Sequence, residues 1–377
     1  MDAELQLIAQ LLENARKPED IFGKLDGNQA DALRASYRLL TKVAHPDHYT
    51  DPQDQALAEK AFRALQKWHA SAEDKIKSRT YGLDGAADST SAPTVLVRNR
   101  KREYLVSGTP FAQGDLCNLY QCSYVLDGKE TGGIFKAARN ADDNDLVWNE
   151  AQILKQLASS TEYEQFRAYV PQLVDSFDYR DSTASQARRV NVLALAEGPY
   201  YSLKEVRAAY PHGIDAKDMA WIWRRLLIVL GFAHMSNVFH GAVLPTHILI
   251  QPENHGLVLI DWSYALYEPA PDEYIPAIST EYKDWYPPEV LAKEPPRPGT
   301  DIYLGALCML YLLGGDAVKG TIPESVPKRI QSFFRGTTLK GQAQRPQDAL
   351  RLLDEFTELI ESLWGPRKFR EFYMPKK

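Results

Sequence analysis

The sequence predicts an α+β protein, with an all-helical N-terminal part and a C-terminal part that opens with a small antiparallel sheet and continues mainly as helices. Residues 1–81 are rich in Ala, Leu, Gln, Lys and Glu at helical spacing. Short strand-like runs separated by Gly and Asp turns follow at 104–110, 119–126 and 133–137. From Asp218 onward helical patterns dominate, interrupted by strand-like runs at 248–250 and 258–260.

The length of 377 residues suggests two or three domains, at roughly 100 to 200 residues each. An apolar content of 44% excludes a largely disordered chain. Residues 82–94 combine Gly, Asp, Ser, Thr and Pro without periodicity, which is typical of a flexible linker. We therefore expect an N-terminal helical domain at 1–81, a linker at 82–94 and a larger domain at 95–377.

The balance of charges and the cysteines narrow the class of protein. A formal net charge of -6 predicts no general attraction to nucleic acid or to an anionic membrane. The most apolar stretch, 302–313, is shorter than the ~20 residues that span a bilayer, so a buried helix is expected. Cys117, Cys122 and Cys308 are too few and too irregularly spaced for a disulfide framework or a zinc site. With no signal-peptide pattern at the N-terminus, we expect a cytoplasmic protein.

Two long helices are expected in the N-terminal part, from about Gln29 to Ala44 and from about Asp54 to Ala72. The first has an apolar stripe made of Leu33, Tyr37, Leu40 and Ala44. A different face carries three cations, each four positions apart, at Arg34, Arg38 and Lys42. The second helix is expected to bury Phe62 and Leu65 against the first, so that the two pair antiparallel.

Between these helices lies the tripeptide His45-Pro46-Asp47. Pro46 predicts the end of the first helix, because the residue before a proline is pushed out of the helical region. His45 and Asp47 are therefore expected at an exposed turn. Taken alone, the tripeptide also fits a simple proline-containing helix stop.

In context, residues from about Pro18 to Gly82 resemble a J domain, the co-chaperone module that stimulates the ATPase of a DnaK-type heat-shock chaperone. The resemblance depends on the basic helix, the tripeptide, the helix with Phe62 and Leu65, and the closing segment Ser78–Gly82. It implies that Arg34, Arg38 and Lys42 contact the chaperone, together with Pro46, and that His45 and Asp47 carry the stimulating signal. The chain lacks the Gly/Phe-rich segment and zinc-binding cysteine repeats of general-purpose J proteins, which points to a specialised member.

Residues 104 to about 365 resemble the protein-kinase-like fold, with a sheet lobe and a mainly helical lobe. Ile134-Phe135-Lys136 is similar to the strand whose lysine holds nucleotide phosphates, and Glu150 to the helical glutamate that pairs with it. Asp261-Trp262-Ser263 occupies the place of the magnesium-holding Asp-Phe-Gly. The later landmarks of the family are structural, and here they are Pro287-Pro288-Glu289, the helix of Asp301, and Arg345.

The catalytic segment departs from the family pattern His-Arg-Asp-Leu-Lys-Pro-Glu-Asn. It begins at His240, has Ala242 in place of the catalytic aspartate and Leu244 in place of the lysine, and ends with His247 in place of the asparagine. Alanine can neither accept a proton nor orient a hydroxyl. The glycine-rich loop is also eroded, because Gly114 is the one glycine kept and Asp115 adds a negative charge. These departures indicate a pseudokinase.

Several alternatives stay open from the sequence. Lys136, Glu150 and Asp261, with Gly114, either bind ATP and magnesium or form an ion-pair network that holds the two lobes together. His247 either bonds to the backbone or replaces a metal ligand. The favoured function is a J-domain co-chaperone whose pseudokinase domain binds an unknown client. The alternatives are an atypical ATP-dependent transferase, with His240 or His247 as substitute base, and an adaptor switched by nucleotide binding.

Overall fold

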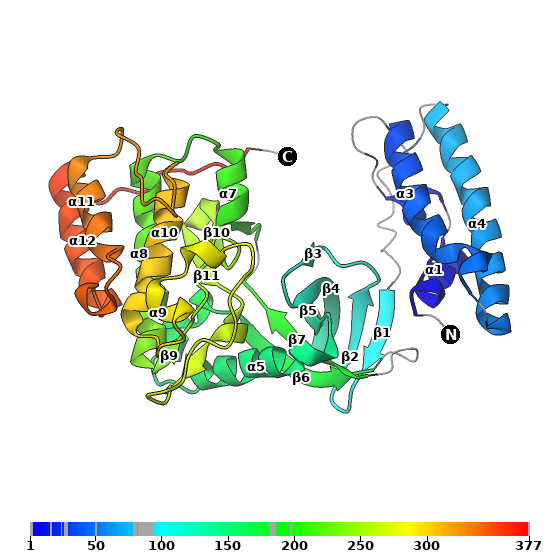
Figure 1. Ribbon diagram of the computed structural model, residues 1–377, viewed down its shortest axis with the longest axis horizontal. Coiled ribbons are helices and arrows are strands. Elements are labelled where there is room, and N and C mark those ends of the chain that lie inside the picture. Colours follow the sequence, from blue (N-terminus) through cyan, green and yellow to red (C-terminus); the bar gives the residue numbers. More distant parts are fainter. Residues whose placement is uncertain are drawn as a thin grey trace. The chain divides into compact units, whose positions relative to one another are not determined.

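A computed structural model describes residues 3–15, 17–23, 25, 29–49, 51–77, 81, 94–180, 186–196 and 198–375 (Figure 1). The described residues form an α+β protein, as predicted: helices come first, and an antiparallel sheet and further helices follow. The chain divides into a first unit, 1–112 with 119–132 and 178–188, and a second unit, 113–118 with 133–177 and 189–377. Most of the predicted linker, 82–93, and the closing-segment residues 78–80 and 82 lie outside the described residues, so these predictions remain predictions.

The first unit begins with helices α1 (Ala3–Asn14), α2 (Glu19–Phe22), α3 (Gln29–Ala44) and α4 (Pro52–Lys77), with a 3-10 turn at Pro46–His48 between the last two. The bounds of α3 are those predicted, and α4 is longer than predicted at both ends. In Figure 1, α3 and α4 lie side by side and antiparallel, as expected.

These helices enclose a core of their own. Its buried side chains come from all four helices and include Leu5, Phe22, Leu33, Ala58 and Leu65. Tyr81 closes the core, since its ring is buried and its hydroxyl donates to the carbonyl oxygen of Gly23 at 3.0 Å. Phe62, predicted to be buried, lies only partly buried, at the turn end of the helix pair.

The strands of the first unit form antiparallel pairs. The strands that start the sheet are β1 (Thr94–Arg98), β2 (Glu103–Ser107), β3 (Ala112–Gln113) and β4 (Cys117–Leu126). In the β1–β2 pair Val97 lies opposite Tyr104, and in the β2–β4 pair Leu105 lies opposite Ser123. The sequence analysis predicted β2 and β4 but not β1.

The second unit contains most of β5 (Lys129–Ala138) and two strands that the sequence analysis did not predict, β6 (Gln172–Tyr179) and β7 (Arg188–Ala194). Strands β5 and β7 pair antiparallel with Lys136 opposite Asn191. Helix α5 (Asn144–Ala158) follows β5 and buries one face, which includes Val147, Ile153 and Leu157.

The rest of the second unit is mainly helical. Its helices are α6 (Tyr163–Phe166), α7 (Leu203–Ala209), α8 (Ala216–Met235), α9 (Pro288–Leu291), α10 (Pro298–Leu312), α11 (Lys328–Thr337) and α12 (Ala349–Trp364). Short strands form two small antiparallel sheets, β11 (Gly256–Leu259) with β10 (Ile248–Gln251) and β8 (Tyr201–Ser202), and β12 (Leu266–Tyr267) with β9 (Val238–Phe239).

Helices α8 and α10 form the centre of this unit, with α12 against α8 (Figure 1). Helix α10, predicted from the apolar run at 302–313, is buried over almost its whole length, as an all-round apolar helix should be. Gly305 lets α8 approach closely, because a Cβ there would lie 2.9 Å from a methyl carbon of Leu226. In the part of the chain that the structure describes, no helix has the length and apolar character to cross a membrane.

Candidate functional site

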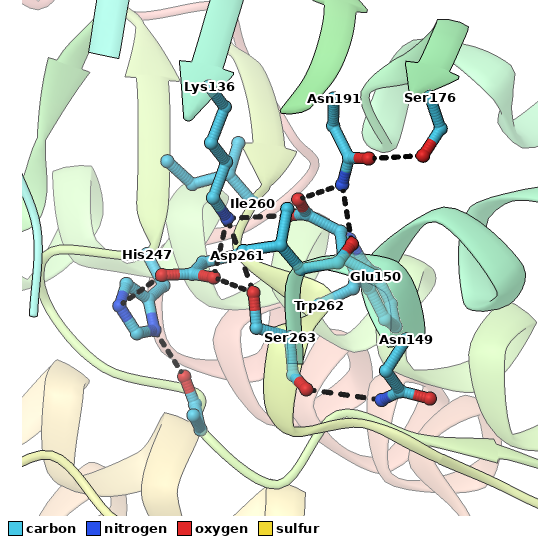
Figure 2. Close-up of polar contacts among 12 residues, drawn as sticks. Lys136, Asn149, Glu150, Ser176, Asn191, His247, Ile260, Asp261, Trp262 and Ser263 are labelled. Atoms are coloured by element: carbon cyan, nitrogen blue, oxygen red, sulfur yellow. Dashed lines mark hydrogen bonds and ion pairs between the residues drawn. The ribbon is translucent and has the colours of Figure 1, made fainter. Parts of the chain in front are cut away.

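Three charged side chains from distant parts of the second unit meet in one place (Figure 2). Lys136 lies on β5 and Glu150 on α5, and Asp261 is the second residue after the end of β11. The Nζ atom of Lys136 lies 2.8 Å from Glu150 Oε1, 2.8 Å from Asp261 Oδ1 and 3.3 Å from Ser263 Oγ. The sequence analysis expected Lys136, Glu150 and Asp261 to lie together, and the structure brings them together.

An amide and a hydroxyl from two neighbouring strands hold Glu150 in place. Asn191 on β7 donates from Nδ2 to Glu150 Oε2 at 2.9 Å and to the Val147 carbonyl at 2.8 Å. Ser176 on β6 donates to Asn191 Oδ1 at 2.8 Å, as Figure 2 shows. Both carboxylate oxygens of the fully buried Glu150 thus have a partner. The sequence analysis missed Asn191 and Ser176, which lie on the two strands it did not predict.

The charges of this cluster stabilise one another. Burial by itself would lower the pKa of Lys136, but the carboxylates of Asp261 and Glu150 outweigh burial and hold that pKa above its ordinary value. Burial would likewise raise the pKa of Asp261, and the positive charge of Lys136 outweighs it and holds that pKa below its ordinary value. The lysine is therefore charged and the aspartate ionised.

The backbone at Asp261 is unusual and directs its side chain. Asp261 has φ 63° and ψ 67°, in the left-handed region that aspartate visits more readily than most residues. The following Trp262 is fully buried, and its indole nitrogen donates to the Leu259 carbonyl at 2.9 Å. This anchor fixes the turn that presents the Asp261 carboxylate to Lys136.

The loop between β9 and β10 lies against the same aspartate. The Nε2 atom of His247 is 3.4 Å from Asp261 Oδ2, and its Nδ1 atom donates to the Ala242 carbonyl at 2.8 Å. His247 thus contacts both the backbone and Asp261. Ala242 is fully buried, and its methyl group can neither accept nor donate a proton.

His240 is held on both sides of its ring. Its Nε2 atom donates to the Ile260 carbonyl at 3.0 Å, and its Nδ1 atom accepts from the Ala242 backbone N–H at 3.2 Å. Burial lowers the pKa of His240 to about 4, so the ring is neutral near pH 7. With both nitrogens engaged, His240 has no free position from which to act as a base.

Two buried ionic contacts fix the surrounding backbone. Asp301 on α10 accepts from the backbone N–H groups of His240 and Gly241 at 2.8 Å each, an arrangement that the positive φ of Gly241 (73°) allows. Glu289 and Arg345 form a buried two-bond pair, with N–O distances of 2.6 and 2.8 Å. These residues position the loop and the segment after it and do not face the charged cluster.

The loop around Gly114 is tied to a distant segment. The Gly114 N–H donates to the Cys117 carbonyl at 2.8 Å, which makes a tight turn. At its tip, Asp115 Oδ2 accepts from the hydroxyl of the buried Ser279 at 2.6 Å. The sequence analysis had noted the charge of Asp115 but had not foreseen this contact, which closes the loop onto residues that follow β12.

A magnesium ion would find few free ligands at this site. The carboxylate of Asp261 faces the loop, and Lys136, Ser263 and His247 already contact its two oxygens. Magnesium prefers oxygen ligands in near-octahedral geometry, and imidazole nitrogen is a poor substitute. Because Mg²⁺ is commonly held by one or two carboxylates together with waters and substrate phosphates, magnesium binding at Asp261 stays a prediction. Across the described residues, no three His, Cys, Asp or Glu side chains lie close enough to hold any metal ion.

A second candidate site lies at the turn between α3 and α4. Pro46–His48 form a 3-10 turn capped by His45, whose Nδ1 accepts from the Asp47 N–H at 3.3 Å. The His45 ring packs edge-on against Phe62 of α4, with centroids 5.2 Å apart. The side chain of Asp47 is 83% exposed and that of His45 41%, so both are open to a partner.

Polar contacts from the end of this turn brace the last turn of α3. His48 Nδ1 donates to the Lys42 carbonyl at 2.6 Å, and the Tyr49 hydroxyl donates to the Val43 carbonyl at 2.7 Å. These bonds satisfy carbonyls that a helix end leaves without a partner. The three cations predicted along α3, Arg34, Arg38 and Lys42, are all exposed. Sequence analysis missed His48 and Tyr49, although both directly follow the tripeptide.

The three cysteines do not form a reactive site. Cys117, Cys122 and Cys308 are buried and unpaired. Burial raises the pKa of Cys117 and of Cys122 to about 12, so neither is a thiolate near pH 7.

Comparison with known proteins adds no family to this picture. No protein-family model matches the chain, and no curated protein matches its sequence. Any assignment of function therefore depends on the geometry of the two candidate sites.

Proposed function

We propose that the protein is a J-domain co-chaperone. It recruits a DnaK-type heat-shock chaperone through its N-terminal helices and stimulates the ATPase of that chaperone. The observation that carries the proposal is the exposed His45-Pro46-Asp47 turn at the end of the helix with the basic face.

The basic face of α3 supports electrostatic docking. Arg34, Arg38 and Lys42 follow one another at one-turn spacing and are exposed on the helix that leads to the tripeptide. Arg34 has a surface partner in Asp31 at 3.3 Å, a contact worth little in water. On a chain with a net charge of -6, this local positive surface would guide the protein toward an acidic surface on the chaperone.

The second unit would serve as a protein-kinase-like scaffold without phosphoryl transfer. Ala242 supplies no base, and the ring nitrogens of His240 are both engaged. Lys136 is paired with both Glu150 and Asp261, which supports the ion-pair role over the nucleotide role. In this proposal the scaffold binds a client protein, and the tethered helices raise the effective concentration of the chaperone near that client.

The experiment that tests the proposal is chaperone ATPase stimulation by the full chain. The wild-type chain should accelerate hydrolysis, and His45→Gln should abolish the acceleration. Arg63→Gln is the matched control, because Arg63 is an exposed residue of α4 with a surface ion pair only. Full stimulation by His45→Gln would overturn the proposal.

One observation favours a second candidate, an atypical ATP-dependent transferase. Lys136, Glu150 and Asp261 lie together as the residues of a nucleotide site would, with the Gly114 loop in the same unit. A transferase would use them to bind ATP. His247 would then act as the general base, a role that the side chain of Ala242 cannot perform. Purified chain that labels neither itself nor other proteins from ATP with magnesium would remove this candidate.

A further inference from the structure

A small polar pocket lies in the second unit and shares no lining residue with the charged cluster. It has a volume of about 120 Å³ and is lined by Trp221, Arg224, Arg225, Ile228, His255 and Arg367. Four of these residues come from α8, where spacings of three, one and three place them on one side of the helix. His255 follows the turn after β10, and Arg367 belongs to the segment after α12.

The three arginines are held mainly through their Nε atoms, which leaves terminal guanidinium nitrogens available to a ligand. Arg224 donates from Nε to Thr357 Oγ1 at 3.2 Å. Arg225 donates from Nε to the His255 carbonyl at 3.2 Å and from Nη1 to the Tyr169 hydroxyl at 2.7 Å. Among the described residues these contacts engage neither Nη atom of Arg224 and only one of Arg225. Guanidinium groups anchored through Nε keep their terminal N–H groups available for a ligand.

Positive charge is in excess at this pocket. Arg367 lies 3.3 Å from Glu361, which is the one carboxylate within ion-pair distance of the three guanidinium groups among the residues described. The pKa of Arg224 is lowered, first because burial disfavours its charge and then because Arg367 and Arg225 repel it. Three positive charges with one carboxylate nearby repel one another in this half-buried pocket, and a bound anion would relieve that repulsion.

The aromatic side of the pocket is rigid. The ring of His255 stacks on Trp221, with centroids 4.3 Å apart and an angle of 3° between the planes. Phe369 covers the other face of His255 at 4.5 Å. The His255 Nε2 atom donates to the Arg370 carbonyl at 2.7 Å, which ties the segment carrying Arg367 to this stack. The pocket is therefore assembled before any ligand arrives, which lowers the entropic cost of binding.

We propose that this pocket binds a phosphate group, as free inorganic phosphate or as a phosphomonoester. The volume of about 120 Å³ has room for a single small oxyanion. Planar guanidinium forks match the oxygens of phosphate and bind it in two-bond fashion. The site is independent of the proposed chaperone recruitment.

The test is isothermal titration of the full chain with inorganic phosphate, and separately with O-phosphoserine, at constant ionic strength. Saturable binding of either compound to one site supports the proposal, and tighter binding of O-phosphoserine would identify a phosphomonoester as the ligand. Arg224→Gln and Arg367→Gln should each weaken binding by about tenfold or more, since each removes a charged donor. Because Arg367 lies outside every helix, its variant also covers the case in which Arg224→Gln fails to fold.

Arg351→Gln is the matched control, because Arg351 is an exposed residue of α12 whose partner is Glu355 of the same helix. It should bind phosphate as the wild type does. Absence of saturable binding to the wild-type chain would overturn the proposal. So would binding that Arg367→Gln leaves at the affinity of the Arg351→Gln control.

Discussion

Lys136 Nζ lies 2.8 Å from Asp261 Oδ1, although the two residues are 125 positions apart in the sequence. In phosphoryl-transfer sites a lysine and an aspartate of this kind face the phosphates and the metal ion. Here the one lysine is shared by two carboxylates, Asp261 and Glu150, so the three side chains together carry one negative charge in excess. The lysine therefore has no free side on which to meet a phosphate in this arrangement.

Removing the lysine should destabilise the second unit strongly. Lys136→Met leaves the fully buried carboxylate of Glu150 and the partly buried carboxylate of Asp261 without their cation, which should cost about 3 to 5 kcal/mol of unfolding free energy. Urea unfolding of the full chain measures this loss. Lys155→Met, on the exposed side of α5, is the control and should change stability little. Equal stability of the two variants would mean that the cluster does not hold this unit together.

Under the second candidate function, in which the cluster binds ATP, the negative charge of Asp115 should restrict nucleotide binding. Asp115→Asn removes that charge from the loop around Gly114 and weakens its bond to Ser279. We expect the variant to bind ATP more tightly than the wild-type chain, by about tenfold, because one charge repulsion worth about 1.4 kcal/mol is removed. Fluorescence titration with an ATP analogue measures the affinity. Weaker binding by Asp115→Asn would show that the aspartate assists the nucleotide.

Asp218 should make stability depend on pH. Burial raises its pKa from 3.8 to about 6, and this effect outweighs the attraction of Arg370, whose Nε atom lies 3.3 Å away. A carboxyl whose pKa is raised by folding contributes stability below its unfolded pKa and loses it as the pH rises through its folded pKa. Asp218→Asn should therefore be more stable than wild type by about 1 to 3 kcal/mol near pH 7, and the gain should vanish near pH 4. A gain in unfolding free energy that is equal at pH 4 and pH 7 would show that the raised pKa of Asp218 is not its cause.

Much of the fold could be predicted because local patterns determine it. Pro46 ends α3 at the predicted residue, and the apolar run at 302–313 became the buried helix α10. Strands β10 and β11 also lie within one or two residues of the predicted runs. Strands β6 and β7 were missed because neither shows the alternation of buried and exposed residues that identifies a strand. Most residues of β6 are half-buried on both faces, and the interior of β7 is buried on both faces.

The site could be predicted only in part, for a physical reason. Lys136, Glu150 and Asp261 were identified by their resemblance to a known pattern, but their partners come from elements with no local signal. Asn191 meets Glu150 only because β7 pairs with β5 in one register. The contact of Asp115 with Ser279 joins residues 164 positions apart. The segment after α12 has no regular secondary structure over 367–375 and packs Phe372 against Trp221.

The basic face of α3 should control chaperone affinity through charge. Arg38→Glu reverses an exposed charge on that face and should weaken chaperone binding by about tenfold at low salt. The difference between variant and wild type should shrink as salt rises, because exposed charges are screened over about 8 to 10 Å near physiological ionic strength. Surface plasmon resonance at two salt concentrations tests this. A loss that is independent of salt would point to misfolding of α3.

The most direct test of the account follows ATP labelled on its γ-phosphate in one mixture of the full chain, a DnaK-type chaperone and magnesium. Released phosphate reports chaperone hydrolysis, and label on protein reports transfer by the chain itself. We predict that the wild-type chain increases phosphate release and that His45→Gln does not. We also predict that protein labelling does not depend on Lys136, so that the wild type and Lys136→Met give the same labelling. Protein labelling that depends on Lys136, or equal phosphate release with wild type and His45→Gln, would contradict the account.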